Sequence, residues 1–289
     1  MLDFGDAERR ILHYFNGIRR IFFEGQEWNV VEAGKPTCSF GEPKTDIFVL
    51  IESDNCYREL KVSYKMENAD FIENKINCTR AEQILGPSWR EIIEDATLSI
   101  REEFERRQVI FREQSGRTER GSITLGWKFE LVNRPNGDLS GRLDLFPRQV
   151  YDVYAGNNLS SDKRNSYVNG RMIENSGIAD YILVTNNARS AQDVVNMMIP
   201  IEVYIQDHPD IFFACKALNY RSFIKKYDGD RPLAVQVDWN IRNNKMYHVL
   251  VFDSPLEFNG DRVANKLINC MRLLNIHTTD DINENNTEL

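Results

Sequence analysis

Two short apolar runs separated by a polar stretch constrain most strongly how this chain can fold. The first run is TDIFVLI (residues 45–51), and the second lies within YRELKVSY (residues 57–64). Both are rich in β-branched and aromatic residues, which favour strands. The residues between them, 52–57, include Ser-Asp-Asn, a composition typical of a turn. We therefore expect the two runs to pair as a β-hairpin.

Three of the charged side chains on this expected hairpin could act together. Asp46 opens the first strand, and the alternation of side chains along a strand puts Glu59, Lys61 and Ser63 on one face of the second. We expect the two carboxylates to converge on one cation, with the lysine beside them. One or two carboxylates are enough to hold Mg²⁺ against a substrate phosphate, and a lysine stabilises the charge that develops there. The pattern predicts metal-dependent phosphodiester hydrolysis, with Asp46 and Glu59 as metal ligands and Lys61 as the third catalytic residue.

Two other interpretations of such acids stay open. Charged residues on a solvated sheet face produce the same pattern without any chemistry. A second acid pair also exists, because Asp180 precedes the apolar run YILV (residues 181–184) and Glu202 follows it. Tyr204 stands where that pair would need a lysine, so the first set is preferred.

The residues around the hairpin resemble a known family. The segments GEPKTDIFV (residues 41–49) and RELKVSYK (residues 58–65) are similar to the active-site core of the PD-(D/E)XK nucleases. The likeness is greatest to restriction endonucleases with a Pro-Lys-Thr-Asp segment before the E-x-K strand. NADFIENK (residues 68–75) is similar to the stretch that follows this strand in such enzymes. Two residues separate the proline from the aspartate here, whereas the family name implies that they are adjacent.

The resemblance implies a restriction-endonuclease-like α/β (α+β) fold, in which helices flank a central mixed sheet. It implies Mg²⁺ as cofactor and double-stranded DNA as partner, cut at a specific short site by a homodimer with two symmetric active sites. By motif position, the metal-binding acids are Asp46 and Glu59, and the lysine that assists attack is Lys61. Related nucleases often draw a further carboxylate from their first helix, and Glu24 is the candidate here.

Polar and basic side chains near this site in the sequence are candidates for DNA contact, although a plain surface role fits each of them as well. These residues are Lys44, Ser63, Lys65, Lys75, Arg80 and Gln83.

The rest of the chain is expected to divide into two parts. Residues 1–115 form the catalytic core, and residues 116–289 form a β-rich region for DNA recognition, dimerisation or both, with no clear linker between them. Apolar periodicity and turn residues predict these elements. We expect helices over 6–23, 69–85, 88–112 and 261–274, and a hairpin over 233–241 and 245–252.

Composition excludes several classes of protein. No apolar run reaches the roughly 18 residues of a membrane span, and the first residues do not resemble a signal peptide, so we expect a cytoplasmic protein. The five cysteines form no C-x-x-C pair, which argues against a structural zinc site. A net charge of −8 argues against a general DNA-compacting protein but leaves room for a local basic groove.

Other functions remain compatible with the sequence. A nuclease of the same core could act in repair, recombination or phage biology, and cleavage of branched or damaged DNA alone would identify it. The chain could also bind DNA without catalysis, or be a structural domain in which the motif arose by chance.

Overall fold

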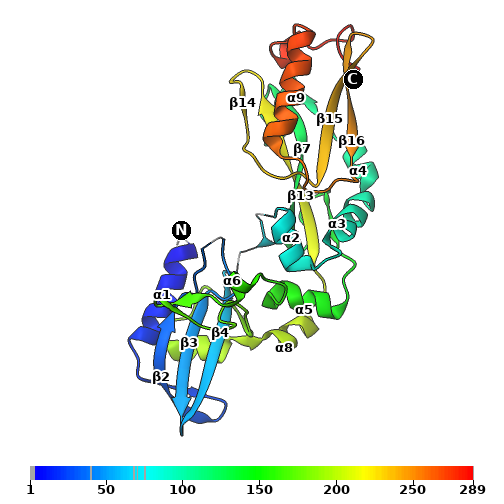
Figure 1. Ribbon diagram of the computed structural model, residues 1–289. Coiled ribbons are helices and arrows are strands. Elements are labelled where there is room, and N and C mark those ends of the chain that lie inside the picture. Colours follow the sequence, from blue (N-terminus) through cyan, green and yellow to red (C-terminus); the bar gives the residue numbers. More distant parts are fainter. Residues whose placement is uncertain (1–3, 40, 68, 70, 75, 289) are drawn as a thin grey trace. The chain divides into compact units, whose positions relative to one another are not determined.

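The computed structural model describes residues 4–39, 41–67, 69, 71–74 and 76–288. Helices and strands are mixed along the chain, so the expected α+β class is confirmed. The chain forms two compact units (Figure 1), and each is described here by itself. None of the helices in these residues is both long and apolar enough to cross a membrane.

The two units are interleaved in the sequence. The first comprises Met1–Asp70, Gln83–Gly86 and Leu145–Asp210, and the second comprises Phe71–Glu82, Pro87–Asp144 and Ile211–Leu289. This division differs from the expected boundary at residue 115. The chain returns to the first unit because a late strand, residues 181–184, pairs with the strand that carries Glu59 and Lys61.

The first unit contains a six-stranded mixed sheet in the order β1-β2-β3-β4-β11-β12. Strand β11 runs parallel to β4, and the other pairs are antiparallel. The mixed sheet flanked by helices is therefore as expected. Its elements are α1 (Phe4–Asn16), β1 (Arg20–Phe23), β2 (Gln26–Gly34), β3 (Ile47–Ser53), β4 (Cys56–Lys65), α5 (Pro147–Ala155), α6 (Ser161–Arg164), β9 (Tyr167–Val168), β10 (Arg171–Met172), β11 (Tyr181–Val184), α7 (Ala191–Met197), β12 (Ile199–Pro200) and α8 (Ile201–Asp207).

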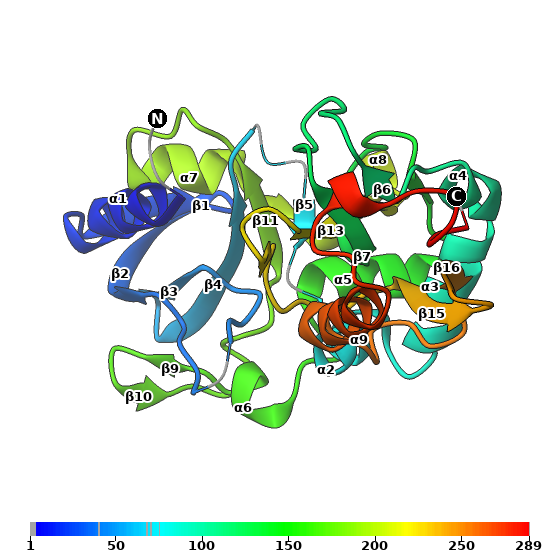
Figure 2. The same cartoon turned by 90° about the horizontal axis from the view of Figure 1, so that it is seen from above.

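Helices α1 and α7 cover one face of this sheet, while α6 and the short hairpin β9–β10 lie on the other side (Figure 2). On the α1 side, the core takes alternate residues of the central strands, such as Val49, Leu60 and Val62, each at most 1% exposed. Phe48, on the opposite face, is also fully buried. Strand β3 is thus covered on both faces, which explains its continuous apolar sequence.

The second unit is built on a larger sheet in which β14-β13-β7-β15-β16 are neighbours, β5 and β6 also pair with β7, and β8 pairs with β13. Gly126 lets β7 approach β15, since a Cβ there would lie 2.4 Å from the Val235 carbonyl oxygen. The elements are β5 (Phe71–Glu73), α3 (Trp89–Leu98), α4 (Arg101–Glu105), β6 (Ile110–Phe111), β7 (Ser122–Val132), β8 (Ser140–Arg142), β13 (Phe212–Arg221), β14 (Lys226–Tyr227), β15 (Val235–Arg242), β16 (Lys245–Val251), α9 (Gly260–Leu273) and a 3₁₀ turn (Thr279–Asp281); α2 (Cys78–Leu85) spans the division between the units.

The hairpin of β15 and β16 and the helix α9 agree with the sequence predictions, but three expected helices are too long. The first ends at Asn16, and its last predicted turn is instead strand β1, which pairs with β2. The second begins as strand β5, because residues 71–73 pair with β7. The third divides into α3 and α4, and its end is strand β6. In the last two cases, pairing with a distant strand overrides local helical periodicity.

Candidate active site

Strands β3 and β4 form the hairpin expected from the sequence. They pair from Ile47↔Val62 to Ser53↔Cys56, and the turn between them consists of Asp54 and Asn55. Both turn residues have positive φ (50° and 62°), a conformation that aspartate and asparagine tolerate. Because side chains alternate, residues 59, 61, 63 and 65 of β4 share one face.

Asp46 lies at the end of this hairpin that is farther from the turn. Its backbone N–H donates to the Val62 carbonyl at 2.9 Å, and its Oδ2 accepts a hydrogen bond from the Tyr64 N–H at 2.7 Å. The Ser63 hydroxyl lies 3.5 Å from the same oxygen. These contacts place Asp46 beside Ser63 and Tyr64.

The register keeps Asp46 away from Glu59. Asp46 lies beside Ser63, whereas Glu59 pairs with Leu50. Ser63 and Glu59 are four residues apart along β4, and at the rise of a strand their Cα atoms are about 13 Å apart. Lys61 pairs with Phe48, two residues along from Ser63. The expectation that Asp46 and Glu59 converge on one cation is therefore wrong in this register. Ser63 and Lys65 occupy the positions beside Asp46 that the sequence had given to Glu59 and Lys61.

The charges around Asp46 come from three separate segments of the chain. Burial raises the pKa of Asp46 to about 6; Lys65 opposes this shift most strongly, and Glu8 adds to it. The Tyr64 hydrogen bond and the charge of Lys35 also lower this pKa. A carboxylate held in such surroundings is a typical candidate for a functional group.

Glu8 supplies a second carboxylate to this region. It lies on α1, is only 3% exposed and forms an ion pair with Lys35, whose Nζ is 2.5 Å from its Oε2. Burial alone would lower the pKa of Lys35, but the hydrogen bond and charge of Glu8, with the charge of Asp46, raise it. Glu24, the candidate named from the sequence, instead follows β1 and pairs with Arg58.

Sequence reasoning missed Glu8, although a sign of its burial was present. In α1 it precedes the buried Ile11 by three residues and the buried Phe15 by seven, so it belongs to the apolar stripe of the helix. An acid on a buried helical face needs a partner or a function.

Glu59 and Lys61 belong to a second cluster. The Lys61 ammonium lies 3.3 Å from Asp180 Oδ2 and 3.4 Å from the Asn175 carbonyl oxygen. Burial raises the pKa of Glu59, Lys61 lowers it, and Asp180 raises it. The rival acid Asp180 thus joins the predicted Glu59 and Lys61, whereas Glu202 lies in the first turn of α8.

The DNA-contact candidates are scattered. Lys44, Ser63 and Gln83 are buried, at 7%, 4% and 8% exposure, which leaves them little surface for a DNA backbone. Gln83 Oε1 accepts a hydrogen bond from Lys163 at 2.9 Å. Arg80 belongs to the second unit and pairs with Glu73, while Lys75 lies outside the described residues. Lys65 is half-buried beside Asp46.

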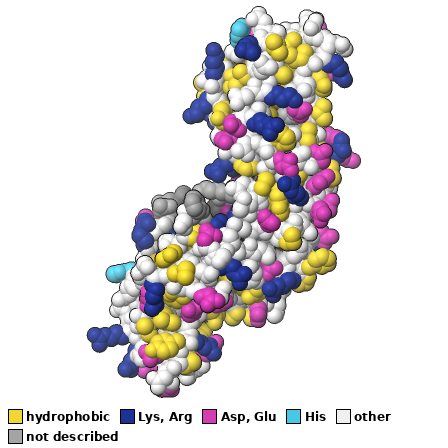
Figure 3. Space-filling model, viewed as in Figure 1, with side chains coloured by type: hydrophobic (Ala, Val, Ile, Leu, Met, Phe, Trp, Pro, Cys, Tyr) yellow, Lys and Arg dark blue, Asp and Glu magenta, His cyan; other side chains and the backbone are white. Residues whose placement is uncertain are grey.

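On one face of the molecule, surface charge does not mark a region for DNA binding. On the face shown in Figure 3, basic and acidic side chains are interspersed over the described surface. DNA contact on that face would therefore depend on local groups rather than on a broad positive field.

The residues at Asp46 suit magnesium better than metals that need several protein ligands. Among the described residues, no group of three or more His, Cys, Asp and Glu side chains could hold a metal ion. Mg²⁺ usually takes one or two carboxylates and completes its shell with water and substrate phosphate. The Ser63 hydroxyl and the Tyr64 N–H both donate to the same carboxylate oxygen of Asp46, Oδ2. Asp46, with Glu8 nearby, fits this requirement.

The raised pKa of Asp46 predicts a pH-dependent stability for the metal-free protein. The folded state binds this proton more tightly than the unfolded state, in which the pKa returns to its ordinary value of 3.8. The free energy of unfolding should therefore fall as the pH rises from about 4 to above 6, by about 3 kcal/mol. Urea unfolding of wild type and Asp46→Asn in EDTA measures this. The variant should match wild type at pH 4 and exceed it at pH 8; identical profiles would contradict the assigned environment of Asp46.

Comparison of the chain with protein families, with curated proteins and with solved structures finds no match.

Proposed function

We propose that this protein is a Mg²⁺-dependent endonuclease that hydrolyses phosphodiester bonds of double-stranded DNA. The observation that carries the proposal is the surroundings of Asp46. Asp46 is a half-buried carboxylate with a pKa of about 6, and it lies at the end of the hairpin formed by β3 and β4. The positive charge of Lys65 and the negative charge of Glu8, a second carboxylate, both act on it. The motif resemblance of residues 41–49 and 58–65 supports the same chemistry.

In this proposal, Asp46 and Glu8 hold the cation and Lys65 faces the substrate phosphate. When bound, Mg²⁺ supplies a more acidic water and neutralises charge on the phosphate. The Tyr64 N–H fixes one oxygen of Asp46 through a 2.7 Å hydrogen bond, which orients the carboxylate. The Lys65 ammonium adds a positive charge that stabilises the phosphate as negative charge builds.

The choice of Lys65 over Lys61 follows from the hairpin register. The sequence motif E-x-K fits residues 59–61, but the S-x-K triplet of residues 63–65 is the one beside Asp46. Both triplets place their lysine on the same face of β4. Glu59, Lys61 and Asp180 then form a supporting ion cluster, and the assignment of Glu59 and Lys61 as catalytic is the alternative.

Restriction-type specificity and a homodimer belong to the proposal through the motif resemblance. Two symmetric sites are the simplest arrangement for cutting both strands of a duplex.

Incubation of the full chain with plasmid and phage DNA, with Mg²⁺ or with EDTA, tests the activity. We expect discrete fragments with Mg²⁺ and intact DNA with EDTA. Branched and gapped duplexes in parallel reactions separate a restriction enzyme from a repair or recombination nuclease. Intact DNA on all of these substrates, with a folded protein, would contradict the proposal and favour a binding or structural role.

A further inference from the structure

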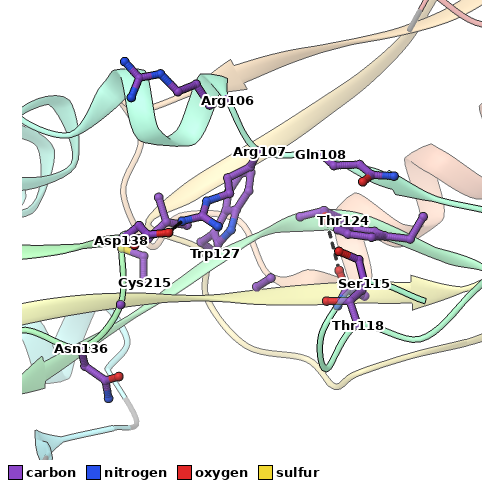
Figure 4. Close-up of a pocket in the computed structure, with 15 residues that line it drawn as sticks. Arg106, Arg107, Gln108, Ser115, Thr118, Thr124, Trp127, Asn136, Asp138 and Cys215 are labelled. Carbon is purple, nitrogen blue, oxygen red and sulfur yellow. Dashed lines mark hydrogen bonds and ion pairs between the residues drawn. The ribbon is translucent and has the colours of Figure 1, made fainter. Parts of the chain in front are cut away.

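The second unit contains a cavity of about 500 Å³ that the proposed active site does not use (Figure 4). It lies against β7 and β13, and its walls come from residues 106–111, from the loop before β7 and from the loop between β7 and β8. Cavities of this size are typical of sites for small organic groups.

The residues that β7 and β13 contribute to the cavity are uncharged. Trp127, Ala217 and Cys215 line it, and these residues share one face because Trp127 pairs with Ala217 in the antiparallel register. Burial raises the pKa of the Cys215 thiol, and Glu130 raises it further, so the sulfur stays neutral at physiological pH. This surface suits an uncharged group.

The strand pairing places an amide on this surface. Asn219 lies on the same face of β13 as Cys215 and Ala217 because side chains alternate along a strand. The register skips Leu125, so the bulge lies in β7, where it brings Thr124 opposite Asn219. The Thr124 hydroxyl donates to Asn219 Oδ1 at 3.1 Å, which fixes the orientation of the amide. Asn219 Nδ2 then remains as a donor at the wall of the cavity.

The charged residues of the wall are paired with opposite charges. Arg107 donates to Asp138 at 2.7 Å, as the close-up in Figure 4 shows. Arg106 is shared between two carboxylates of α4 at 2.7 and 2.8 Å. Gln108 Nε2 donates to the Ile110 carbonyl, which leaves its Oε1 as an acceptor. The wall therefore offers donors and acceptors without a surplus of positive charge, which favours a neutral ligand over a phosphate.

We infer that this cavity binds one nucleobase of the DNA substrate, taken out of the helical stack. A base is uncharged and carries donors and acceptors on its edge, which matches the uncharged strand residues and the polar side chains of Asn219 and Gln108 in the wall. Enzymes read an extruded base in this way, by hydrogen bonds to its edge within an enclosing pocket. The inference rests on the proposed nuclease function, but its first test does not require cleavage.

Ligand-observed NMR of the full chain with each of the four deoxynucleosides tests the cavity itself. One deoxynucleoside should bind about ten-fold more tightly than the others, since a well-placed amide discriminates between base edges. Asn219→Ala and Thr124→Val should remove that preference. Asn240→Ala, on β15 and outside the cavity lining, is the matched control and should retain it. Absence of binding, or equal binding by the Asn219 variant, would overturn the inference.

A second arm identifies DNA as the source of the base. The preferred deoxynucleoside should compete with DNA cleavage by wild type, and Asn219→Ala should reduce cleavage at least ten-fold. Deoxynucleoside binding with no effect on cleavage would assign the cavity to a free nucleoside and overturn the inference while leaving the nuclease function intact. Absence of cleavage by wild type would instead contradict the proposed function. The NMR measurement would still show whether the cavity binds a deoxynucleoside, because it does not depend on cleavage.

Discussion

Asparagine in place of Asp46 should reduce DNA cleavage by ~10³-fold, the loss of roughly 4 kcal/mol of transition-state stabilisation. The substitution keeps the shape of the side chain, and its oxygen can still accept the Tyr64 hydrogen bond. The negative charge that attracts the cation is lost. Cleavage should therefore fall while the fold, followed by circular dichroism, and DNA binding, followed in Ca²⁺, remain as in wild type.

Asp54→Asn provides a matched control for this prediction. It is the same chemical change on the same hairpin, at a turn position with a φ of 50° that asparagine also tolerates. Its cleavage rate should stay within a factor of about two of wild type, since surface changes of this kind alter little. Cleavage by Asp46→Asn at a rate close to that of the control would remove Asp46 from the mechanism.

Replacement of the two lysines of β4 should have unequal effects. Lys65→Met should reduce cleavage by about 10²-fold or more, because it removes the positive charge closest to the substrate phosphate in the proposed site. Lys61→Met should reduce it by less than about ten-fold. Lys61 pairs with Asp180 at 3.3 Å, so its loss should mainly lower the free energy of unfolding, by about 1 kcal/mol.

Single-turnover cleavage rates and urea unfolding of both variants measure these two effects separately. Methionine preserves most of the apolar stem in each case, so the comparison isolates the charge. A greater loss of cleavage for Lys61→Met than for Lys65→Met would contradict the assignment and return the catalytic role to Glu59 and Lys61.

The sequence was sufficient to predict the hairpin, its turn and the shared face of Glu59, Lys61 and Ser63. The register was also accessible, because a turn centred between Asp54 and Asn55 pairs residue 46 with residue 63. Motif similarity favours the E-x-K triplet of residues 59–61. Counting residues outward from the turn instead places the S-x-K triplet of residues 63–65 beside Asp46. Counting outward from a turn is therefore a useful check on any motif that requires two strands to meet.

Other features depend on contacts that one sequence does not reveal. The parallel pairing of β11 with β4 brings residues 181–184 back to the first unit, and nothing local in that segment specifies its partner. The strand at residues 71–73 forms because β7 is available to pair with it. The packing of α1 against β2 and β3 brings the charge of Glu8 to bear on Asp46, and this packing is not specified by the sequence of α1 alone.

Binding of Mn²⁺, a paramagnetic substitute for Mg²⁺, tests the central claim most directly. Electron paramagnetic resonance of the full chain should detect one site at Asp46 and Glu8, lost in Asp46→Asn, weakened in Glu8→Gln and retained in Glu59→Gln. Mn²⁺ bound equally well by wild type and Asp46→Asn, or lost only in Glu59→Gln, would contradict the proposed site.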